Sequence, residues 1–461
     1  MKPIQELEKS ILVALFEPHT RDSEIQSIME EMELLTRSAG GEVVAMFPQK
    51  RHPPDGRYLI GLGKVEEIKN YACAHDVNLI IFYNQLSNVQ QRNLERFFNM
   101  KVIDRTRLIL DVFATRARSL EGKLQVELAQ LLYLLPRLTG KGVDLSRLGG
   151  GIGTRGPGET KLEADRRTIN KRISLIKKKL EKVILNRDTQ RQSRKFNPIP
   201  VVSLAGYTSA GKSTLFQALT GEDTPISPML FSTLDPLLRR VDLGEIEEGY
   251  CFLLSDTVGF IRQMPKELFQ AFQATLEEIV QSDLIVHVID ISDPDYLNRK
   301  EEVQIVLEKL EIPVEKIIPV YNKIDLVEKF QVPEMGPTDI IETTEPTEHA
   351  EHTEHIEHME HAAYTEETEE KKETGKIFIS AKKKQGLWAL KKAIFNKYFS
   401  DYRRYQIQIP KDLINLDSIS HWAIVLSKNY QGELLNIEML CSQENMVKFQ
   451  EKYGGYVKCV K

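Results

Sequence analysis

Short apolar runs alternate with helical stripes over the first hundred residues of the chain. Runs of this length are typical of buried strands, and three of them predict strands: Ile11–Phe16, Glu42–Phe47 and Val77–Tyr83. The spacing of apolar residues after the first run predicts a helix with Ser23 and Gln26 as its capping box. A second helix is expected from Val65 to Ala74. This alternation indicates a small α/β domain with a parallel or mixed sheet at residues 1–115.

Helical periodicity dominates the next eighty residues. Leucines recur at helical spacing from Gly122 to Leu138, and a longer apolar stripe runs from Leu162 to Ile184 with basic residues on its other faces. A stretch with eight glycines, Gly140–Gly158, separates the two. We therefore expect a helical hairpin with a glycine-rich loop at residues 116–196.

Strands and helices alternate again at residues 197–400. Apolar runs predict strands at Ile199–Ala205, Leu237–Leu243, Cys251–Asp256, Leu284–Ile291, Ile317–Asn322 and Lys376–Ser380. This pattern is typical of a doubly wound α/β sheet. Residues 401–461 predict a small α+β domain with two strands, Tyr405–Ile409 and Leu434–Leu440, and a helix near Glu444–Lys452.

Composition indicates a globular protein and excludes a disulfide scaffold. The 461 residues include only four cysteines and no Cys-x-x-Cys pair, which fits a reducing compartment. The first apolar run spans six residues, too few for a signal peptide or a membrane span. We expect a cytoplasmic, monomeric protein without a membrane span.

Charge is unevenly distributed along a chain of net charge −5. Residues 331–375 hold 14 acidic residues against two lysines, so the rest of the chain is net positive. Residues 161–195 hold 13 Lys or Arg against four acidic residues. A basic helix of this kind can bind nucleic-acid phosphates, although most charged helices are simply solvated surfaces.

Five Glu-His-x repeats occupy residues 348–362 inside the acidic segment. Histidine-rich tracts can bind zinc or nickel, so a metal site is one interpretation. A three-residue period drifts around a helix, and the surrounding Glu and Thr residues cannot form a core. We therefore favour a disordered surface loop, an acidic His-rich insertion at residues 331–375.

The most specific motif in the chain follows the predicted strand Ile199–Ala205. It reads GxxxxGKS and comprises Gly206, Tyr207, Thr208, Ser209, Ala210, Gly211, Lys212 and Ser213. A strand, a glycine loop and a helix in this order form a phosphate cradle, because backbone N–H groups and the helix N-terminus face the anion. Lys212 adds a charge for the outer phosphates, and the Ser213 hydroxyl can bind magnesium. A turn that merely joins a strand to a helix is the alternative, and the flanking elements disfavour it.

A DxxG motif closes the predicted strand Cys251–Asp256. Its residues are Asp256, Thr257, Val258 and Gly259. Asp256 can hold magnesium through water, and Gly259 lets a backbone N–H approach a γ-phosphate. The motif is weak alone and becomes specific after a phosphate loop.

Two further loops are candidates for selecting the nucleotide base. One comprises Asn322, Lys323, Ile324 and Asp325, and the other comprises Ser380, Ala381 and Lys382. Asp325 can accept hydrogen bonds from N1 and N2 of guanine, and adenine lacks the second donor. The Ser380–Lys382 loop can add a backbone N–H for guanine O6. The ordered motifs thus predict a GTPase of the translation-factor-related class.

The chain resembles the HflX family of ribosome-associated GTPases over roughly residues 11–400. The resemblance is carried by residues 256–265, 271–278 and 231–236, and upstream by residues 58–64, 102–106, 121–130 and 150–160. It departs from the family pattern at Ser209, where Asn is common, at Leu62 and at Arg107. Ser209 is still small and polar, so this change does not put nucleotide binding in doubt.

The resemblance implies a first switch segment that binds nucleotide, made of Phe231, Ser232, Thr233, Leu234 and Asp235. It implies Mg²⁺ held by Ser213 and Thr233, and GTP hydrolysis in which Lys212, Thr233 and Gly259 take part. It also implies GTP and GDP as ligands and the large (50S) ribosomal subunit with its rRNA as partner. Subunit splitting or recycling, or ribosome biogenesis, would be the process served.

Phe260 stands where many regulatory GTPases place a glutamine that orients the attacking water. A phenylalanine cannot do this, so we expect a slow intrinsic rate that the ribosome stimulates. Two rival functions stay open: a non-catalytic GTP-dependent binding switch, and an RNA-remodelling NTPase that also uses ATP. A further glycine pattern, Gly151, Gly153 and Gly156, lacks a preceding strand, which disfavours a dinucleotide fold; an arginine-bearing RNA-contacting loop and a plain linker are its alternatives.

Overall fold

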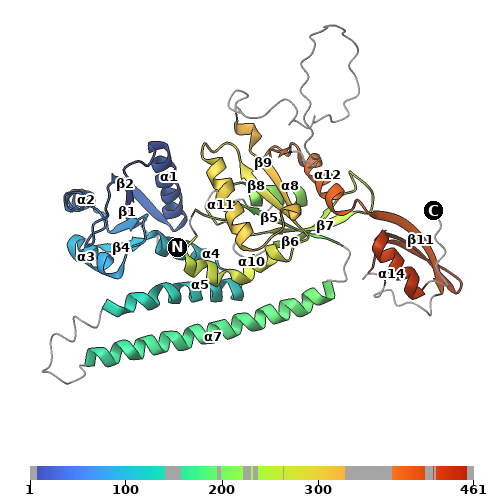
Figure 1. Ribbon diagram of the computed structural model, residues 1–461, viewed down its shortest axis with the longest axis horizontal. Coiled ribbons are helices and arrows are strands. Elements are labelled where there is room, and N and C mark those ends of the chain that lie inside the picture. Colours follow the sequence, from blue (N-terminus) through green and yellow to red (C-terminus); the bar gives the residue numbers. More distant parts are fainter. Residues whose placement is uncertain are drawn as a thin grey trace, which may run out of the picture.

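Three sheets carry the fold in the part of the chain that the computed structural model describes, which is residues 8–140, 157–194, 199–221, 230–231, 237–262, 264–327, 376–410, 419 and 422–453. They form a row in Figure 1, and a pair of helices runs along one side of the first two sheets. We name the three the N-terminal unit (residues 8–116), the central unit (199–399) and the C-terminal unit (402–453).

The N-terminal unit is an all-parallel sheet of order β2-β1-β3-β4. Its strands are β1 (Glu8–Phe16), β2 (Gly41–Lys50), β3 (Leu79–Phe82) and β4 (Lys101–Asp104), and its helices are α1 (Asp22–Ser38), α2 (Leu62–Ala74), α3 (Asn88–Phe98) and α4 (Arg105–Arg116). Alternate residues of β1 face opposite sides: Leu12 and Ala14 pack under α1 and α4, and Ile11 and Val13 pack under α2 and α3. The predicted α/β unit is confirmed, and of the two expected sheet types, parallel or mixed, its sheet is parallel.

The expected capping box at Ser23 and Gln26 is wrong. The N-cap of helix α1 is Arg21, two residues before Ser23, and it makes no side-chain cap. Ser23 therefore already lies inside the first turn, which begins at Asp22. The capping box of this unit occurs instead at α3, where Ser87 and Gln90 bond each other's backbone N–H groups.

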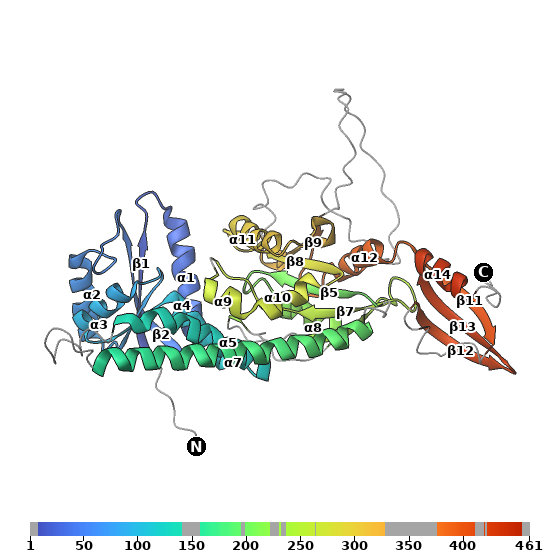
Figure 2. The same cartoon turned by 60° about the horizontal axis from the view of Figure 1, so that its bottom comes forward.

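A pair of helices follows, as the periodicity predicted. They are α5 (Leu120–Leu134), extended by the 3₁₀ turn η1 (Leu135–Gly140), and α7 (Pro157–Arg194). They lie side by side in both views (Figure 2), with Ile173, Ile176 and Leu180 of α7 buried in the apolar cluster that includes α5. Arg172 forms two hydrogen bonds with Glu127, at 2.6 and 2.9 Å. Residues 141–156, most of the glycine-rich stretch, lie outside the described residues.

The central unit is a six-stranded sheet of order β10-β9-β8-β5-β7-β6, parallel except for β6. Its strands are β5 (Val201–Gly206), β6 (Leu237–Asp242), β7 (Cys251–Asp256), β8 (Leu284–Asp290), β9 (Ile317–Asn322) and β10 (Ile377–Phe378). Helices α8 (Lys212–Thr220) and α12 (Leu387–Tyr398) cover one face, and α10 (Gln273–Val280) and α11 (Tyr296–Lys309) cover the other. The doubly wound α/β sheet is confirmed. The insertion at residues 331–375 lies outside the described residues.

The C-terminal unit is an antiparallel sheet of order β11-β13-β12 with one helix. Its elements are β11 (Tyr402–Pro410), β12 (Ile424–Gln431), β13 (Leu434–Ser442) and α14 (Gln443–Tyr453). The predicted α+β character is confirmed, with one strand more than expected. Strand β12 escaped prediction because most of its side chains are exposed and polar.

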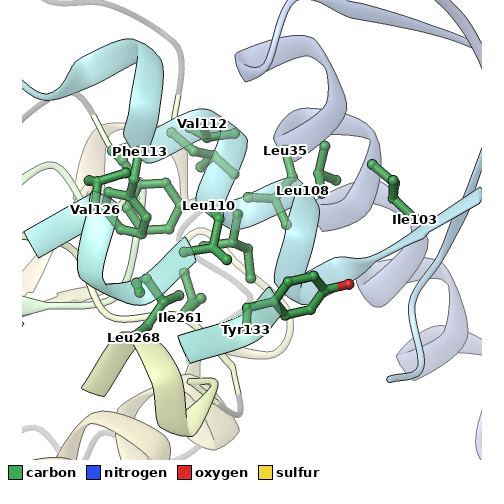
Figure 3. Packing of buried hydrophobic residues seen from close by; sticks show 14 of the residues in the cluster. Leu35, Ile103, Leu108, Leu110, Val112, Phe113, Val126, Tyr133, Ile261 and Leu268 are labelled. Atoms are coloured by element: carbon green, nitrogen blue, oxygen red, sulfur yellow. The ribbon is translucent and has the colours of Figure 1, made fainter. Parts of the chain in front are cut away.

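One apolar cluster joins the N-terminal unit, the helix pair and the central unit (Figure 3). Phe113 of α4 is its aromatic centre: its ring lies 4.5 Å from that of Phe231 and 4.8 Å from that of Phe272. Val126 of α5 and Leu268 of α9 (Lys266–Ala271) belong to the same cluster. The three segments therefore share a core, which fixes the N-terminal unit beside the loops at the end of the central sheet.

Candidate functional site

The loop from Gly206 to Ser213 joins the end of β5 to the start of α8. Two of its positions admit only glycine. A Cβ on Gly206 would lie 2.4 Å from the Val288 carbonyl oxygen, and a Cβ on Gly211, at φ +94°, would lie 2.3 Å from Asn322 Nδ2. The loop therefore closes tightly above the sheet, as a phosphate cradle requires.

Lys212 is buried at the first position of α8. Its ammonium donates to the carbonyl oxygens of Gly206 and Tyr207, at 3.0 and 2.8 Å. Burial lowers the pKa of Lys212 to about 8, and Asp256 opposes the shift. An anion beside this buried ammonium would stabilise its charged form, because its hydrogen bonds in the loop are made to neutral carbonyl groups. The electrostatics of the loop therefore favour phosphate binding.

Ser213 and Asp256 form an oxygen-rich pair beside the loop. The Ser213 hydroxyl donates to Asp256 Oδ2 at 3.0 Å, and Asp256 is 1% exposed at the end of β7. Hydroxyl and carboxylate oxygens are the hard ligands that Mg²⁺ takes together with substrate phosphates, so these residues fit the metal. Thr233, the other expected ligand, lies outside the described residues together with Ser232, Leu234 and Asp235.

The DxxG segment lies against the phosphate loop. Thr208 N–H donates to the Phe260 carbonyl at 2.7 Å, and Phe260 N–H donates to the Gly206 carbonyl at 3.0 Å. A Cβ on Gly259 would lie 2.9 Å from Thr208 Cγ2 and 3.0 Å from Lys212 Nζ. Thr257 anchors the segment from below by donating to the Leu204 carbonyl at 2.5 Å. The Gly259 backbone therefore lies directly beside the Lys212 ammonium.

Asn322 joins the loops expected to select the base to the phosphate loop. Its Nδ2 donates to the Ala210 carbonyl at 2.9 Å, and its Oδ1 accepts the Ala381 N–H at 3.0 Å. The Ser380 hydroxyl donates to Asp325 Oδ1 at 2.6 Å, which orients a half-buried carboxylate at the open end of the site. These contacts bring the Asn322–Asp325 and Ser380–Lys382 loops together, as guanine recognition requires.

Lys323 and Ile324 lie between Asn322 and Asp325 in the Asn322–Asp325 loop. Lys323 has φ +67° and pairs with Asp290 at 2.6 Å across the end of β8. Ile324 begins the 3₁₀ turn η3 (Ile324–Leu326) that carries Asp325.

Phe260 is 2% exposed and lies in an apolar cluster with Tyr207, Leu276 and Ile279. Its ring is buried in this cluster, so Phe260 is a packing residue. Phe231 of the first switch segment is buried as well, against Phe113.

A buried polar contact that the sequence did not suggest reaches the phosphate loop from α1. Glu31 accepts a hydrogen bond of 2.5 Å from the Tyr207 hydroxyl. The available signal was the position of Glu31 within the apolar stripe of α1, between Ile28 and Leu35. A carboxylate on the buried face of a helix needs a partner.

No other metal site emerges from the described residues, which contain no group of three or more His, Cys, Asp or Glu side chains able to hold an ion. The Glu-His-x repeats lie outside them. Within the described ranges, no helix combines the length and the apolar character needed to cross a membrane.

Three family models match the chain. They describe a GTP-binding GTPase N-terminal region at residues 26–114, a GTP-binding GTPase middle region at residues 116–194, and a 50S ribosome-binding GTPase at residues 201–323. These matches cover the N-terminal unit, the helix pair and most of the central unit.

Relatives named GTPase HflX match over about 320 residues. The protein from Caldanaerobacter subterraneus subsp. tengcongensis is 50% identical over 321 residues, 70% of this chain and 73% of that protein. The Escherichia coli protein is 45% identical over 324 residues, 70% of this chain and 75% of that protein. Among solved structures, the crystal structure of SsGBP in complex with GDP is 23% identical, with a TM-score of 0.45 over 86% of this chain and 99% of that one.

Gly211→Ala tests the cradle. The left-handed backbone and the approach to Asn322 both oppose a side chain, and strain of this kind costs about 1–3 kcal/mol. We expect the affinity for GDP to fall about ten- to hundredfold, measured by fluorescent-nucleotide titration.

Gly221→Ala is the matched control. It also has a positive φ, +73°, but has no atom within 4 Å of a new Cβ and ends α8 away from the loop. It should lose some stability and keep its GDP affinity. Equal affinities for the two variants would contradict the account of the loop.

Proposed function

Because this chain belongs to the HflX family of GTPases, we propose that it couples GTP hydrolysis to binding of the large ribosomal subunit, in subunit splitting, recycling or biogenesis. The chain is a GTPase of a ribosome-binding family. The observation that carries the proposal is the combination of a complete phosphate cradle with a buried Phe260. Such a site binds and polarises the nucleotide but holds no side chain at that position to orient water.

We assign the chemistry to residues 197–400. Lys212, the loop amides and the Gly259 N–H would stabilise the charge that develops on the transferred phosphoryl group. Ser213 and Thr233 would hold Mg²⁺, with Asp256 supporting it through water. Bound Mg²⁺ neutralises the β- and γ-phosphate oxygens. Asp325 would accept from guanine N1 and N2, with the Ser380–Lys382 loop at O6.

We assign subunit binding to residues 1–196, and α7 offers the clearest surface for RNA. One exposed face of this helix carries Arg166, Arg167, Lys171 and Lys178, with Glu163 as its acidic member. Cations at this spacing along a straight helix match a run of backbone phosphates. The helix runs past both the N-terminal and central units in Figures 1 and 2. RNA bound to α7 would therefore lie close to the central unit, which holds the proposed nucleotide site.

Large ribosomal subunits should accelerate single-turnover GTP hydrolysis by the full-length protein. Groups supplied in trans to related sites contribute roughly 10³–10⁵ in rate, so a rise of at least tenfold is expected. The small subunit at equal concentration is the control. Equal rates with and without large subunits would refute the coupling.

The double variant Arg166→Ala/Lys178→Ala should bind large subunits more weakly in co-sedimentation. Two lost phosphate contacts lower the slope of log affinity against log salt by about two. Lys309→Ala/Lys428→Ala removes the same charge from exposed positions of α11 and β12 and serves as the control. An unchanged salt slope in the α7 variant would exclude this face as the RNA contact.

A further inference from the structure

One face of α1 contacts the loops around the nucleotide site. The contacts recur at spacings of three, four and seven residues, which is one side of a helix; they are made by Glu24, Ser27, Glu31 and Ser38. They reach the phosphate loop, the residues before the first switch segment, the residues after the DxxG motif, and α11. A helix of the N-terminal unit thus contacts the elements that respond to the γ-phosphate in GTPases.

Glu31 is the more buried of the two acidic residues on this face, at 9% exposure. Its Oε1 accepts from Arg105 Nη2 at 2.8 Å, and its Oε2 accepts from the Tyr207 hydroxyl at 2.5 Å. Both oxygens are therefore engaged, one by a buried cation of α4 and one by the phosphate loop. Burying a carboxylate is costly unless it is paired in this way, so the geometry of Glu31 is tightly specified.

Tyr207 links Glu31 to the segment that follows the DxxG motif. Its hydroxyl accepts the Arg262 N–H at 2.9 Å while donating to Glu31. Burial, and then the Glu31 charge, raise the pKa of Tyr207, so the hydroxyl keeps the proton that it donates. The backbone of Tyr207 is also bridged to Phe260, two residues before Arg262.

The Arg262 side chain completes the connection. Its guanidinium is 8% exposed and pairs with Asp295, with Glu302 at 3.4 Å and with Glu24 of α1 at 3.6 Å. The residue three positions after Gly259 is therefore held at its backbone by Tyr207 and at its side chain by α11 and α1.

We propose that Glu31 is a positioning residue for GTP hydrolysis, which acts through the Tyr207 hydroxyl to fix the segment that carries Gly259. The inference rests on the proposed contact of Gly259 with the γ-phosphate. When Glu31 is lost, Tyr207 loses its acceptor and the Arg262 N–H loses a fixed partner. The backbone hydrogen bonds of Phe260 to Gly206 and Thr208 still hold the phosphate-loop side of the segment. The Arg262 side is no longer fixed, so the Gly259 N–H is placed less precisely, and a displacement of about 1 Å at a reacting centre costs up to ~100-fold in rate.

Docking of the N-terminal unit does not depend on Glu31 alone. Ser38 accepts the Leu230 N–H at 2.9 Å, Ser27 accepts from Arg299 at 3.3 Å, and the apolar cluster around Phe113 spans the same boundary. A variant at Glu31 therefore leaves these contacts in place while it frees Tyr207; Glu31→Ala also removes the carboxylate partner of Arg105, whereas Glu31→Gln keeps an acceptor for it. Among the described residues, Glu31 contacts the phosphate loop only through the Tyr207 hydroxyl. The proposed contacts with nucleotide are made by the loop amides and by the Asn322–Asp325 and Ser380–Lys382 loops, so we expect affinity to change little.

The test compares Glu31→Ala, Glu31→Gln and Tyr207→Phe in the full-length protein without ribosomes. We expect the single-turnover rate of GTP hydrolysis to fall about 10- to 100-fold in Glu31→Ala and Tyr207→Phe, with the Kd for GDP changed less than about threefold. Glu31→Gln keeps a carbonyl that accepts from the hydroxyl, so its rate should be intermediate. Glu30→Ala removes the same charge from an exposed position of α1 and should match the wild type.

A double-mutant cycle separates positioning from stability. Because both residues act through one hydrogen bond, Glu31→Ala/Tyr207→Phe should be no slower than the slower single variant. Additive losses, an unchanged rate, or GDP affinity that falls in step with the rate would each overturn the inference. If the wild type hydrolyses GTP but ignores large subunits, the ribosome proposal fails and this comparison is unaffected.

Discussion

Parallel pairing of β5 with β7 and β8 is the constraint on which the site depends. The register places Leu204 opposite Asp256 and Gly206 opposite Val288. The carboxyl ends of these strands and of β9 and β10 therefore meet at one edge, where loops from distant parts of the sequence converge. The phosphate loop, the DxxG segment and the Asn322–Asp325 and Ser380–Lys382 loops all begin at this edge, and their hydrogen bonds to one another follow from it.

Packing around the edge explains why the site needs more than its motifs. The Lys212 ammonium donates hydrogen bonds to carbonyl groups of its own loop, and the DxxG segment is hydrogen-bonded to that loop through Thr208 and Phe260. In the proposed mechanism, the γ-phosphate would lie beside Lys212 and Gly259. Helix α1 contacts Tyr207 and Arg262, so we expect a change at the phosphate to alter the contacts of the N-terminal unit. This unit shares its apolar core with the basic helix α7.

Much of the fold followed from the sequence because buried parallel strands read as continuous apolar runs. The strands Cys251–Asp256 and Ile317–Asn322 were predicted with the bounds observed. Strand β4, with four residues, and the exposed strand β12 gave too weak a pattern. The motif residues could be named because their spacing is local. The bond between Glu31 and Tyr207 joins residues 176 positions apart, and such a contact depends on how two units pack, which no local pattern encodes.

The central claim is that the bound nucleotide controls the affinity of the protein for the large subunit. This requires that GTP and GDP favour different conformations of the protein. Co-sedimentation of the full-length protein with large ribosomal subunits tests it most directly, with a non-hydrolysable GTP analogue in one arm and GDP in the other. The account predicts that the protein pellets with subunits in the presence of the analogue and is largely released with GDP. Equal retention with both nucleotides would contradict it.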